Sequence, residues 1–350
     1  MDISKLNSLV ELYFKKTEEV EGKRPFLKWL KPDKRTYNWE DVTERIYKLT
    51  SKIKSLIKQG DRCLILSENR PYWLMTDIAI MNAGGISVPI FTTYSANDYE
   101  YILNDCKPSL IFVSNQDQYN KIKKFINSDV KKIISFEKID SDSLLMKEIL
   151  DQKINEKIEN KDLKRNMPAC IIYTSGTSGN PKGVVLSHGG ILSNCEGAVE
   201  LLEVLTKKKD PVFLTWLPLS HSYEHTAGLH LPIQIAAEVW YCEGRDKIAA
   251  NLTEVKPTLM TAVPRLYELL HDRITKGVTA KGGLTAYLFW KAVTLGRKKL
   301  LGQTLSVTEA VLDKCLDLLI RKKVRQRFGG RLAFFVSGGA ALNPHIGSFF

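Results

Sequence analysis

Short apolar segments alternate with segments of helical periodicity along most of the chain before residue 264. Residues 63–67, 87–91 and 109–113 are apolar and strand-like, and residues 71–81 and 95–106 between them have helical spacing. Strands that are apolar along their whole length are typical of parallel sheets that are covered on both faces. The pattern therefore predicts an α/β fold of layered, mostly parallel sheets with helices on both faces.

The same alternation continues through the middle of the chain and then stops. Further strands are expected at 132–136, 169–174, 212–216, 238–241 and 258–262, and further helices at 116–127, 188–205 and 226–237. Residues 137–167 are polar and lysine-rich and predict an exposed connection with some helix, residues 264–328 predict long helices, and residues 332–337 predict a strand. We therefore divide the chain into residues 1–167, 168–263, 264–330 and 331–350.

Two of the expected helices carry a capping signal at their start. Ser95 is expected to cap its helix together with Asp98, three residues further on. Asn343 precedes Pro344, which is the order of an N-cap and a first-turn proline. The chain ends soon afterwards inside this second helix, from which we expect the 350 residues to be a truncated chain.

The charge and cysteine content argue against several classes of protein. Lysine and arginine exceed aspartate and glutamate by 51 − 39 = 12, but the lysines between Lys121 and Arg165 alternate with acidic residues, as on solvated helix faces. Since no nucleic-acid-binding motif accompanies the excess, we expect no nucleic-acid partner. The six cysteines are scattered without a CxxC pair, which predicts neither disulfides nor a zinc cluster, and no metal-ligating residue is assigned.

Neither a signal peptide nor a membrane-spanning helix is expected. The first residues mix acids with lysines and lack the apolar stretch and cleavage site of a signal peptide. No run of about 18 apolar residues occurs. A cytoplasmic protein is therefore expected.

Residues 172–184 combine a buried strand with a loop of hydroxyls and glycines that ends in a lysine. Gly176 and Gly179 let main-chain N–H groups approach an anion, and Lys182 adds a compact positive charge. Hydroxyl donors for phosphate oxygens come from four residues: Thr174, Ser175, Thr177 and Ser178. The mononucleotide P-loop is excluded because it requires Gly-Lys-Ser/Thr, which disfavours a kinase-type NTPase. A flexible Gly/Ser turn is the alternative interpretation.

Residues 173–184 resemble the phosphate-binding signature of the adenylate-forming (AMP-binding) superfamily, which joins ATP to a carboxylate. The resemblance implies that residues 174–179 hold the β- and γ-phosphates and that Lys182 steadies the leaving pyrophosphate. Residues 336–342 (VSGGAAL) resemble the adenine-binding segment of the same family. Gly338, Gly339 and Ala340 are thereby implied in binding the base.

A histidine follows in the segment WLPLSH, residues 216–221, which resembles the second motif of this family. The resemblance implies that His221 lines the acyl-carboxylate site. An alternative is that His221 pairs with Glu224 on a surface loop, and the neighbouring His225 is easily confused with it. Residues 36–41 (TYNWED) also resemble a segment common in these enzymes.

The substrate class follows from a resemblance to long-chain fatty-acyl-CoA synthetases, carried by Val263-Pro264-Arg265, the long helical stretch after it, and residues 328–343. Val263, Pro264 and Gly338 are implied in binding the substrate. The implied reaction is ATP-dependent activation of a long-chain fatty acid to acyl-AMP and then acyl-CoA, with Mg²⁺ and coenzyme A. Two alternatives remain open, namely a ligase for another carboxylic acid and a nucleotide- or lipid-binding module without turnover.

Two further expectations concern the surface and the extent of the chain. Residues 285–302 mix aromatic and basic side chains, which fits either a helix resting on a membrane surface or a packed amphipathic helix. The Gly-Tyr-Gly-x-Thr-Glu motif of the family and its small lid domain with a catalytic lysine are absent from the sequence. We therefore expect residues 1–350 to be an incomplete N-terminal AMP-binding domain that turns over poorly alone. The sequence gives no oligomeric state.

Overall fold

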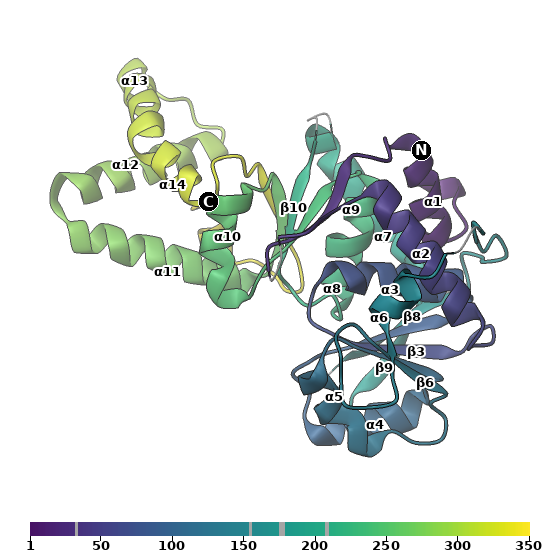
Figure 1. The fold of residues 1–350 in the computed structure, drawn as a ribbon. Helices are drawn as coiled ribbons and strands as arrows, with labels where there is room; N and C mark the ends of the chain where they lie inside the picture. Colours follow the sequence, from purple (N-terminus) through teal and green to yellow (C-terminus); the bar gives the residue numbers. More distant parts are fainter. Residues whose placement is uncertain (32–33, 154–155, 175–178, 207–209) are drawn as a thin grey trace. The chain divides into compact units, whose positions relative to one another are not determined.

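The computed structural model describes the chain except residues 32–33, 154–155, 175–178 and 207–209, and it describes only the backbone of residues 201–206. The chain divides into two compact units (Figure 1). Unit 1 comprises residues 1–211 and 215–242, and unit 2 comprises residues 212–214 and 243–350. The division predicted from the sequence stays a prediction.

A seven-stranded sheet forms the centre of unit 1, in the order β7-β6-β5-β3-β4-β8-β9. Its strands are β3 (Arg62–Leu66), β4 (Ile86–Ile90), β5 (Leu110–Val113), β6 (Lys132–Ser135), β7 (Leu144–Leu145), β8 (Pro168–Thr174) and β9 (Lys182–Ser187). Neighbouring strands are parallel, except that β9 at the edge runs antiparallel to β8. Parallel strands place their carboxyl ends on one edge, where α/β proteins bind their ligands.

Helices cover both faces of this sheet, as the alternating sequence pattern predicted (Figure 1). On one face, α3 (Pro71–Asn82) contacts β3 and β4. On the other, α4 (Ala96–Cys106) and α5 (Gln116–Ile122) bury side chains against the strands. The core there contains Leu64, Leu66, Val88, Ile90, Ile111 and Val113 from the sheet, and Tyr99, Ile102, Leu103, Cys106 and Ile122 from the helices. The predicted capping box of Ser95 and Asp98 is confirmed at the start of α4.

A second, smaller group of strands in unit 1 is built around β1 (Pro25–Trp29). It pairs antiparallel with β2 (Thr36–Asn38) and parallel with β11 (Glu238–Tyr241). Asn38 and Asp41 form a capping box that starts α2 (Trp39–Lys54), and the ring of Trp39 stacks on Phe26 at 3.7 Å. The remaining longer helices of unit 1 are α1 (Leu9–Glu19) and α7 (His188–Thr206), with 3-10 turns at Ile3–Lys5 and Lys123–Phe125.

Unit 2 has three strands that pair in parallel, β10 (Val212–Thr215, of which 212–214 belong to this unit), β12 (Leu259–Ala262) and β13 (Phe334–Ser337). Its helices are α10 (Ile248–Val255), α11 (Pro264–Lys281), α12 (Gly283–Leu300), α13 (Val307–Leu316), α14 (Lys322–Arg327) and α15 (Pro344–Gly347), with a 3-10 turn at Arg245–Lys247 and a π turn at Asp317–Arg321. Asn343 caps α15, as predicted. A small apolar cluster of Ala292, Leu295 and Leu316 joins α12 and α13.

Three local expectations were wrong. The single helix expected at 226–237 is α8 (Ser222–Glu224), a π-helix (His225–His230) and α9 (Leu231–Gln234). Strand β9 was not expected, because glycine and lysine at its start resemble loop residues. The connection 137–167 contains a helix as expected, α6 (Met146–Leu150), but its three apolar residues Met146, Ile149 and Leu150 are buried rather than exposed.

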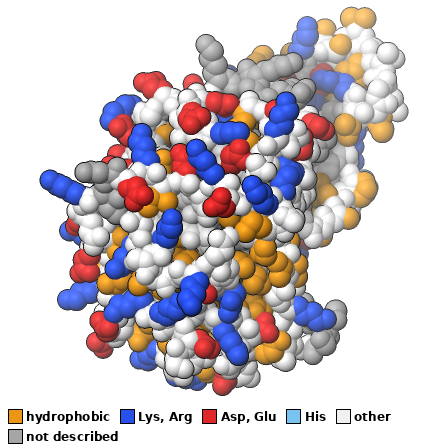
Figure 2. All heavy atoms as spheres, turned by 90° about the vertical axis from the view of Figure 1, so that its right-hand side faces the viewer, with side chains coloured by type: hydrophobic (Ala, Val, Ile, Leu, Met, Phe, Trp, Pro, Cys, Tyr) orange, Lys and Arg blue, Asp and Glu red, His pale blue; other side chains and the backbone are white. Residues whose placement is uncertain are grey.

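Charged side chains of both signs are interspersed on the face of the molecule that Figure 2 shows. Lysine and arginine lie beside aspartate and glutamate there, rather than in a patch of one sign. This is how the alternation of lysines and acids in the sequence appears on the surface. No helix among the described residues is both long enough and apolar enough to span a bilayer.

Candidate functional site

The loop of hydroxyls and glycines connects β8 and β9 at one end of the seven-stranded sheet. Thr174 is the last residue of β8 and Lys182 the first of β9, and the two are paired in the antiparallel register. Gly179 has φ of 101°, a left-handed conformation that favours glycine. Residues 175–178, which include the predicted Ser175, Gly176, Thr177 and Ser178, lie outside the described residues. The loop begins at the carboxyl end of β8, on the edge where such sheets bind ligands.

The strand that leads into this loop is held by the ring of Tyr173. The ring lies across Gly183, where a Cβ atom would stand only 3.0 Å from Cζ of Tyr173. The phenol donates a hydrogen bond to Asp105 on α4, and Tyr94 donates to the main-chain oxygen of Tyr173 at 2.8 Å. Burial and the bond to Asp105 raise the pKa of Tyr173, so the phenol stays protonated. The end of β8 is therefore fixed where the loop starts.

Lys182 is exposed at the start of β9. Within the described part of the chain it makes no ion pair with an acidic side chain. An unneutralised ammonium group beside a glycine-rich loop attracts an anion without first having to break an internal pair.

His221 lies at the start of α8 in unit 1 and is tied to the carboxyl edge of the sheet. Its ring packs edge-on against Phe91, which follows β4, with 6.2 Å between ring centroids. Phe91 in turn packs against Tyr94 at 5.2 Å, and Tyr94 holds the end of β8. Two aromatic contacts and one hydrogen bond therefore join His221 to Tyr173, the residue that precedes Thr174.

The protonation state of His221 follows from its contacts. Its Nδ1 accepts a hydrogen bond from the main-chain N–H of Tyr223 at 3.2 Å, which places the proton of the neutral ring on Nε2. Burial lowers the pKa of His221 below its ordinary value of 6.5. The histidine is therefore neutral at pH 7 and has one N–H group left to donate.

The neighbours of His221 have other contacts in the interior. Glu224 is buried and accepts a hydrogen bond from the hydroxyl of Thr215 at 2.6 Å. His225 is buried as well, and its Nε2 lies 3.1 Å from Oδ2 of Asp77. Burial opposes its protonation, but Asp77 and Cys170 raise the pKa of His225 to about 10. Of the two histidines, His221 is the one that reaches the surface.

Asn69 holds the segment that carries His221, although no sequence pattern singles it out. It follows β3, and its side-chain amide donates to the main-chain oxygen of Leu217 at 2.7 Å and accepts from the N–H of Leu219 at 3.0 Å. One side chain thereby fixes residues 217–219 to the carboxyl edge of the sheet. The two segments are about 150 residues apart in sequence, so the contact has no local signal.

In unit 2, four other predicted residues meet at the ends of β12 and β13. Val263 and Pro264 follow β12, and Gly338 and Gly339 follow β13, which runs parallel to it. The N–H of Gly338 donates to the oxygen of Ala262 at 3.1 Å, and a Cβ on Gly339 would lie 3.7 Å from Cγ1 of Val263. Gly339 has φ of 83°, so most other residues would be strained there. Ala340 continues this turn.

The chain is similar to known proteins along almost its whole length. Residues 14–350 match the family described as "AMP-binding enzyme". The fatty acyl-CoA synthetase A of Dictyostelium discoideum is 27% identical over 99% of this chain and 52% of its own length. The human long-chain-fatty-acid–CoA ligase ACSBG2 is 32% identical over 85% of this chain and 47% of its own. The chain thus spans about half the length of these curated relatives.

Solved structures share the fold. The N-terminal domain of FACL13 from Mycobacterium tuberculosis superposes with a TM-score of 0.70 at 15% identity, covering 98% of this chain and 73% of that one. ATP-bound MatB from Rhodopseudomonas palustris has a TM-score of 0.64 at 18% identity, covering 76% and 51%. At this identity the likeness concerns the fold alone, whereas the match to residues 14–350 assigns the family. The chain belongs to the family of AMP-binding enzymes.

Proposed function

We propose that this chain supplies the ATP- and acid-binding portion of an enzyme that converts a long-chain fatty acid to acyl-AMP and then to acyl-CoA. The observation that carries the proposal is the loop between Thr174 and Lys182, which leaves the carboxyl edge of a parallel sheet and ends in a lysine that has no acidic partner among the residues described. The family match supports ATP as the nucleotide. The names of the relatives support a fatty acid and coenzyme A as the other substrates.

In the proposed reaction, a carboxylate oxygen of the acid attacks the α-phosphorus of ATP and pyrophosphate leaves. Coenzyme A thiolate then attacks the carbonyl carbon of the acyl-adenylate, and AMP leaves with the electrons of the broken C–O bond. Both steps bring anions together, so catalysis depends on positioning and charge stabilisation. Mg²⁺ enters as part of the Mg–ATP substrate and offsets phosphate charge. No residue of this chain is assigned to it.

The residues of the chain have separate roles in this proposal. Lys182 stabilises the charge on the departing pyrophosphate, and the amides of residues 174–179 surround the phosphates. His221 donates its Nε2 proton to the carboxylate oxygen that does not attack, since its Nδ1 is already taken by Tyr223. Gly338, Gly339 and Ala340 lie against the adenine, where side chains would prevent the base from lying flat. Val263 and Pro264 border the same place from β12.

The test compares Lys182→Ala with Lys54→Ala, an exposed lysine of α2 far from the loop in sequence. Both variants are made in a complete enzyme that contains this chain, where fatty-acid-dependent exchange of pyrophosphate into ATP should fall by roughly two to three powers of ten in Lys182→Ala, the scale for losing one preorganised charge-stabilising donor. Lys54→Ala should behave like wild type. An exchange rate within a few-fold of wild type in Lys182→Ala would refute the role of this lysine.

The choice of acid is tested with the same exchange assay. A panel of long-chain, medium-chain, aromatic and amino acids should show the fastest exchange with the long chains, because each buried methylene contributes about 0.8 kcal/mol. Faster exchange with an aromatic or medium-chain acid would assign a different substrate. Calorimetric binding of ATP without exchange for any acid would favour a binding module without turnover.

We also propose that helix α12 contacts a membrane surface, from which fatty acids are drawn. Leu284 and Tyr287 are exposed on this helix, while Phe289, Ala292 and Leu295 are buried within unit 2. The last turn carries Arg297, Lys298 and Lys299, which suits an anionic lipid surface. Replacing Leu284 and Tyr287 by serine should reduce sedimentation with anionic liposomes. Equal binding of the variant and wild type would reject the contact and leave a helix that is simply amphipathic.

A further inference from the structure

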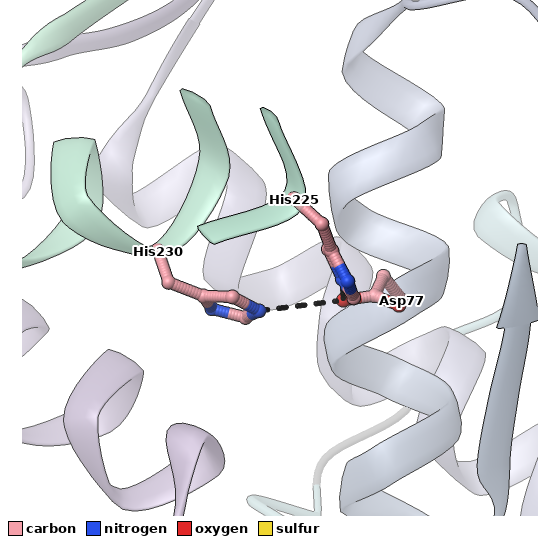
Figure 3. Close-up of side chains that lie close together, drawn as sticks. All are labelled: Asp77, His225 and His230. Atoms are coloured by element: carbon pink, nitrogen blue, oxygen red, sulfur yellow. Dashed lines mark hydrogen bonds and ion pairs between the residues drawn. The ribbon is translucent and has the colours of Figure 1, made fainter. Parts of the chain in front are cut away.

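Three ionisable side chains meet in the interior of unit 1 and have no role in the proposed reaction. Asp77 on α3, and His225 and His230 on the π-helix, are each fully buried and point toward one another (Figure 3). Nε2 of His225 lies 3.1 Å and Nε2 of His230 lies 3.9 Å from Oδ2 of Asp77. One nitrogen or oxygen from each side chain lies within 4.8 Å of the others. The three side chains are therefore candidate ligands for a single small ion, which would draw them slightly closer together.

The backbone conformation is what brings the two histidines together. In an α-helix, residues five apart differ by about 140° around the axis and face different directions. The hydrogen bonds of a π-helix span five residues, and such turns are rare and frequent at functional sites. Here the π-helix places the rings of His225 and His230 with 5.1 Å between their centroids. Both rings then face the same carboxylate.

The ion pair between Asp77 and His225 does not explain why His230 is buried beside them. Nε2 of His225 faces Asp77, and its Nδ1 lies 3.6 Å from Sγ of Cys170. His230 differs, because neither of its ring nitrogens has a hydrogen-bond partner among the described residues. Leaving a buried polar group unpaired costs about 1–3 kcal/mol. A further occupant that accepts the lone pair of His230 removes this cost.

The position of Asp77 is also unusual for a helix that covers a sheet, even with His225 as its partner. Helix α3 is apolar and buried along nearly its whole length, and Asp77 is its only acidic residue. An isolated carboxylate in such a place is destabilising by several kcal/mol unless charge and hydrogen bonds compensate it. A helix that served only to cover the sheet would be more stable with a neutral side chain at this position.

We propose that Asp77, His225 and His230 bind a divalent transition-metal ion, for which Zn²⁺ is the best match. Zn²⁺ takes imidazole nitrogen and carboxylate oxygen at about 2.0–2.2 Å, so two tetrahedral ligand atoms stand about 3.4 Å apart. That spacing falls between the 3.1 and 3.9 Å separations seen here. The ion binds Nε2 of both histidines and Oδ2 of Asp77, with water as the fourth ligand.

In His225, the ring nitrogen that would face away from the ion already has a partner. The ion displaces the proton from Nε2 of His225, while Nδ1 keeps its own proton and faces the sulfur of Cys170. Metal-bound histidines commonly hold their second nitrogen in this way, which fixes the ring. Because all three ligands are fully buried, the ion enters as unit 1 folds and is released only when the π-helix opens.

Binding at this place has a consequence for His221. The N–H of His225 donates to the main-chain oxygen of His221 at 2.8 Å, so the residue assigned to the acid lies one turn before the first metal ligand. The ion would tie the π-helix to α3 and thereby steady the segment that carries His221. Its role is structural, and no step of the proposed reaction passes through it.

The test is a metal analysis of the 350-residue chain refolded with Zn²⁺ and dialysed against a weak chelator. Wild type should retain about one zinc ion per chain. Asp77→Asn and His230→Gln should retain at least about tenfold less, since each loses a ligand. His271→Gln, which removes an imidazole that is not buried, is the matched control and should retain as much as wild type.

A second measurement keeps the test decisive if the variants fold poorly. Wild type loaded with Co²⁺ should show the visible absorption of a tetrahedral site, and a strong chelator should abolish it and lower the melting temperature. Less than a tenth of an ion per refolded wild-type chain would overturn the proposal. Zinc content in a folded His230→Gln equal to that of wild type would overturn it as well.

Discussion

Unit 1 and unit 2 bury their apolar side chains to different degrees. In unit 1, the sheet and its covering helices enclose side chains with no measurable exposure, such as Leu64, Phe112 and Trp39 at 0–1%. In unit 2, large apolar side chains on the helices remain exposed, for example Leu284 at 71% and Val307 at 83%. Burial contributes about 25 cal/mol per Å² of apolar surface. Unit 1 therefore gains more of its stability from packing than unit 2 does.

Charged contacts join several helical segments of unit 2. Asp313 on α13 lies 2.6 Å from Arg321 and 2.8 Å from Lys299, so it joins three segments of the helical region. Asp317 pairs with Arg325 at 2.7 Å. Charged pairs near the surface contribute less than burial and weaken with salt. The comparison teaches that substitutions of the same kind should act differently in the two units.

The largest effect is expected in the core of unit 1. Phe112 on β5 is fully buried at the centre of the sheet. Phe112→Ala should lower the free energy of unfolding by about 3–5 kcal/mol, because it removes a large side chain and leaves a cavity. Denaturant unfolding followed by circular dichroism measures this. A loss under about 1 kcal/mol would show that unit 1 does not depend on its packing as described.

A smaller effect is expected in the apolar cluster of unit 2, which consists of Ala292, Leu295 and Leu316. Leu295→Ala should cost about 2–4 kcal/mol, since Leu295 is fully buried between α12 and α13. The loss should appear as faster amide hydrogen exchange in α12 and α13, with β3 and β5 unchanged. Val311→Ala on α13, where the side chain is 60% exposed, is the control and should change little. Equal acceleration in both units would mean that they open together.

The contribution of Asp313 to the stability of unit 2 should depend on pH. Burial alone would raise the pKa of Asp313, but Lys299 and Arg321 hold it below the ordinary value of 3.8. The pairs therefore stabilise unit 2 fully above that value, and the stabilisation is lost as pH falls through the lowered pKa. Asp313→Asn should cost about 1–2 kcal/mol at pH 7. Thermal melts should show the difference from wild type vanish at low pH, and a difference that persists there would have another cause.

The smallest effect is expected for two matching helix caps. Ser95 caps α4 in unit 1 and Ser306 caps α13 in unit 2, each in a capping box with an acidic residue three positions on. Either change to alanine should cost about 1 kcal/mol. Because α4 packs on the sheet, Ser95→Ala should shift the main unfolding transition. Ser306→Ala should instead speed hydrogen exchange near the start of α13, and the reverse result would contradict the comparison.

Sequence periodicity was sufficient to predict the alternating strands and helices of unit 1. Strands β3, β4, β5 and β6 are short apolar runs separated by longer segments with helical spacing, so the two periods are easily distinguished. The caps at Ser95 and Asn343 follow from local hydrogen-bonding chemistry and were predictable for that reason. These features depend on residues within a few positions of one another.

Features that depend on distant partners were not predictable. The sequence of the π-helix at 225–230 has apolar residues at the spacing of an ordinary α-helix. What distinguishes it is that His225 and His230 contact Asp77, which lies about 150 residues earlier. The sequence did contain two signals that were not used, the pair of histidines five apart and the acidic residue within an apolar helix. The loop between β8 and β9 was found by its composition, whereas Asn69, which holds the segment of His221, was not.

The dependence of this segment on one amide group makes it sensitive to chemical ageing. The nitrogen of Asn69 donates to the oxygen of Leu217, while its amide oxygen accepts from the N–H of Leu219. Deamidation would replace that nitrogen by a carboxylate oxygen and turn an attraction into a repulsion between two acceptors. The loss of this one hydrogen bond would then loosen residues 217–219, the segment that carries His221.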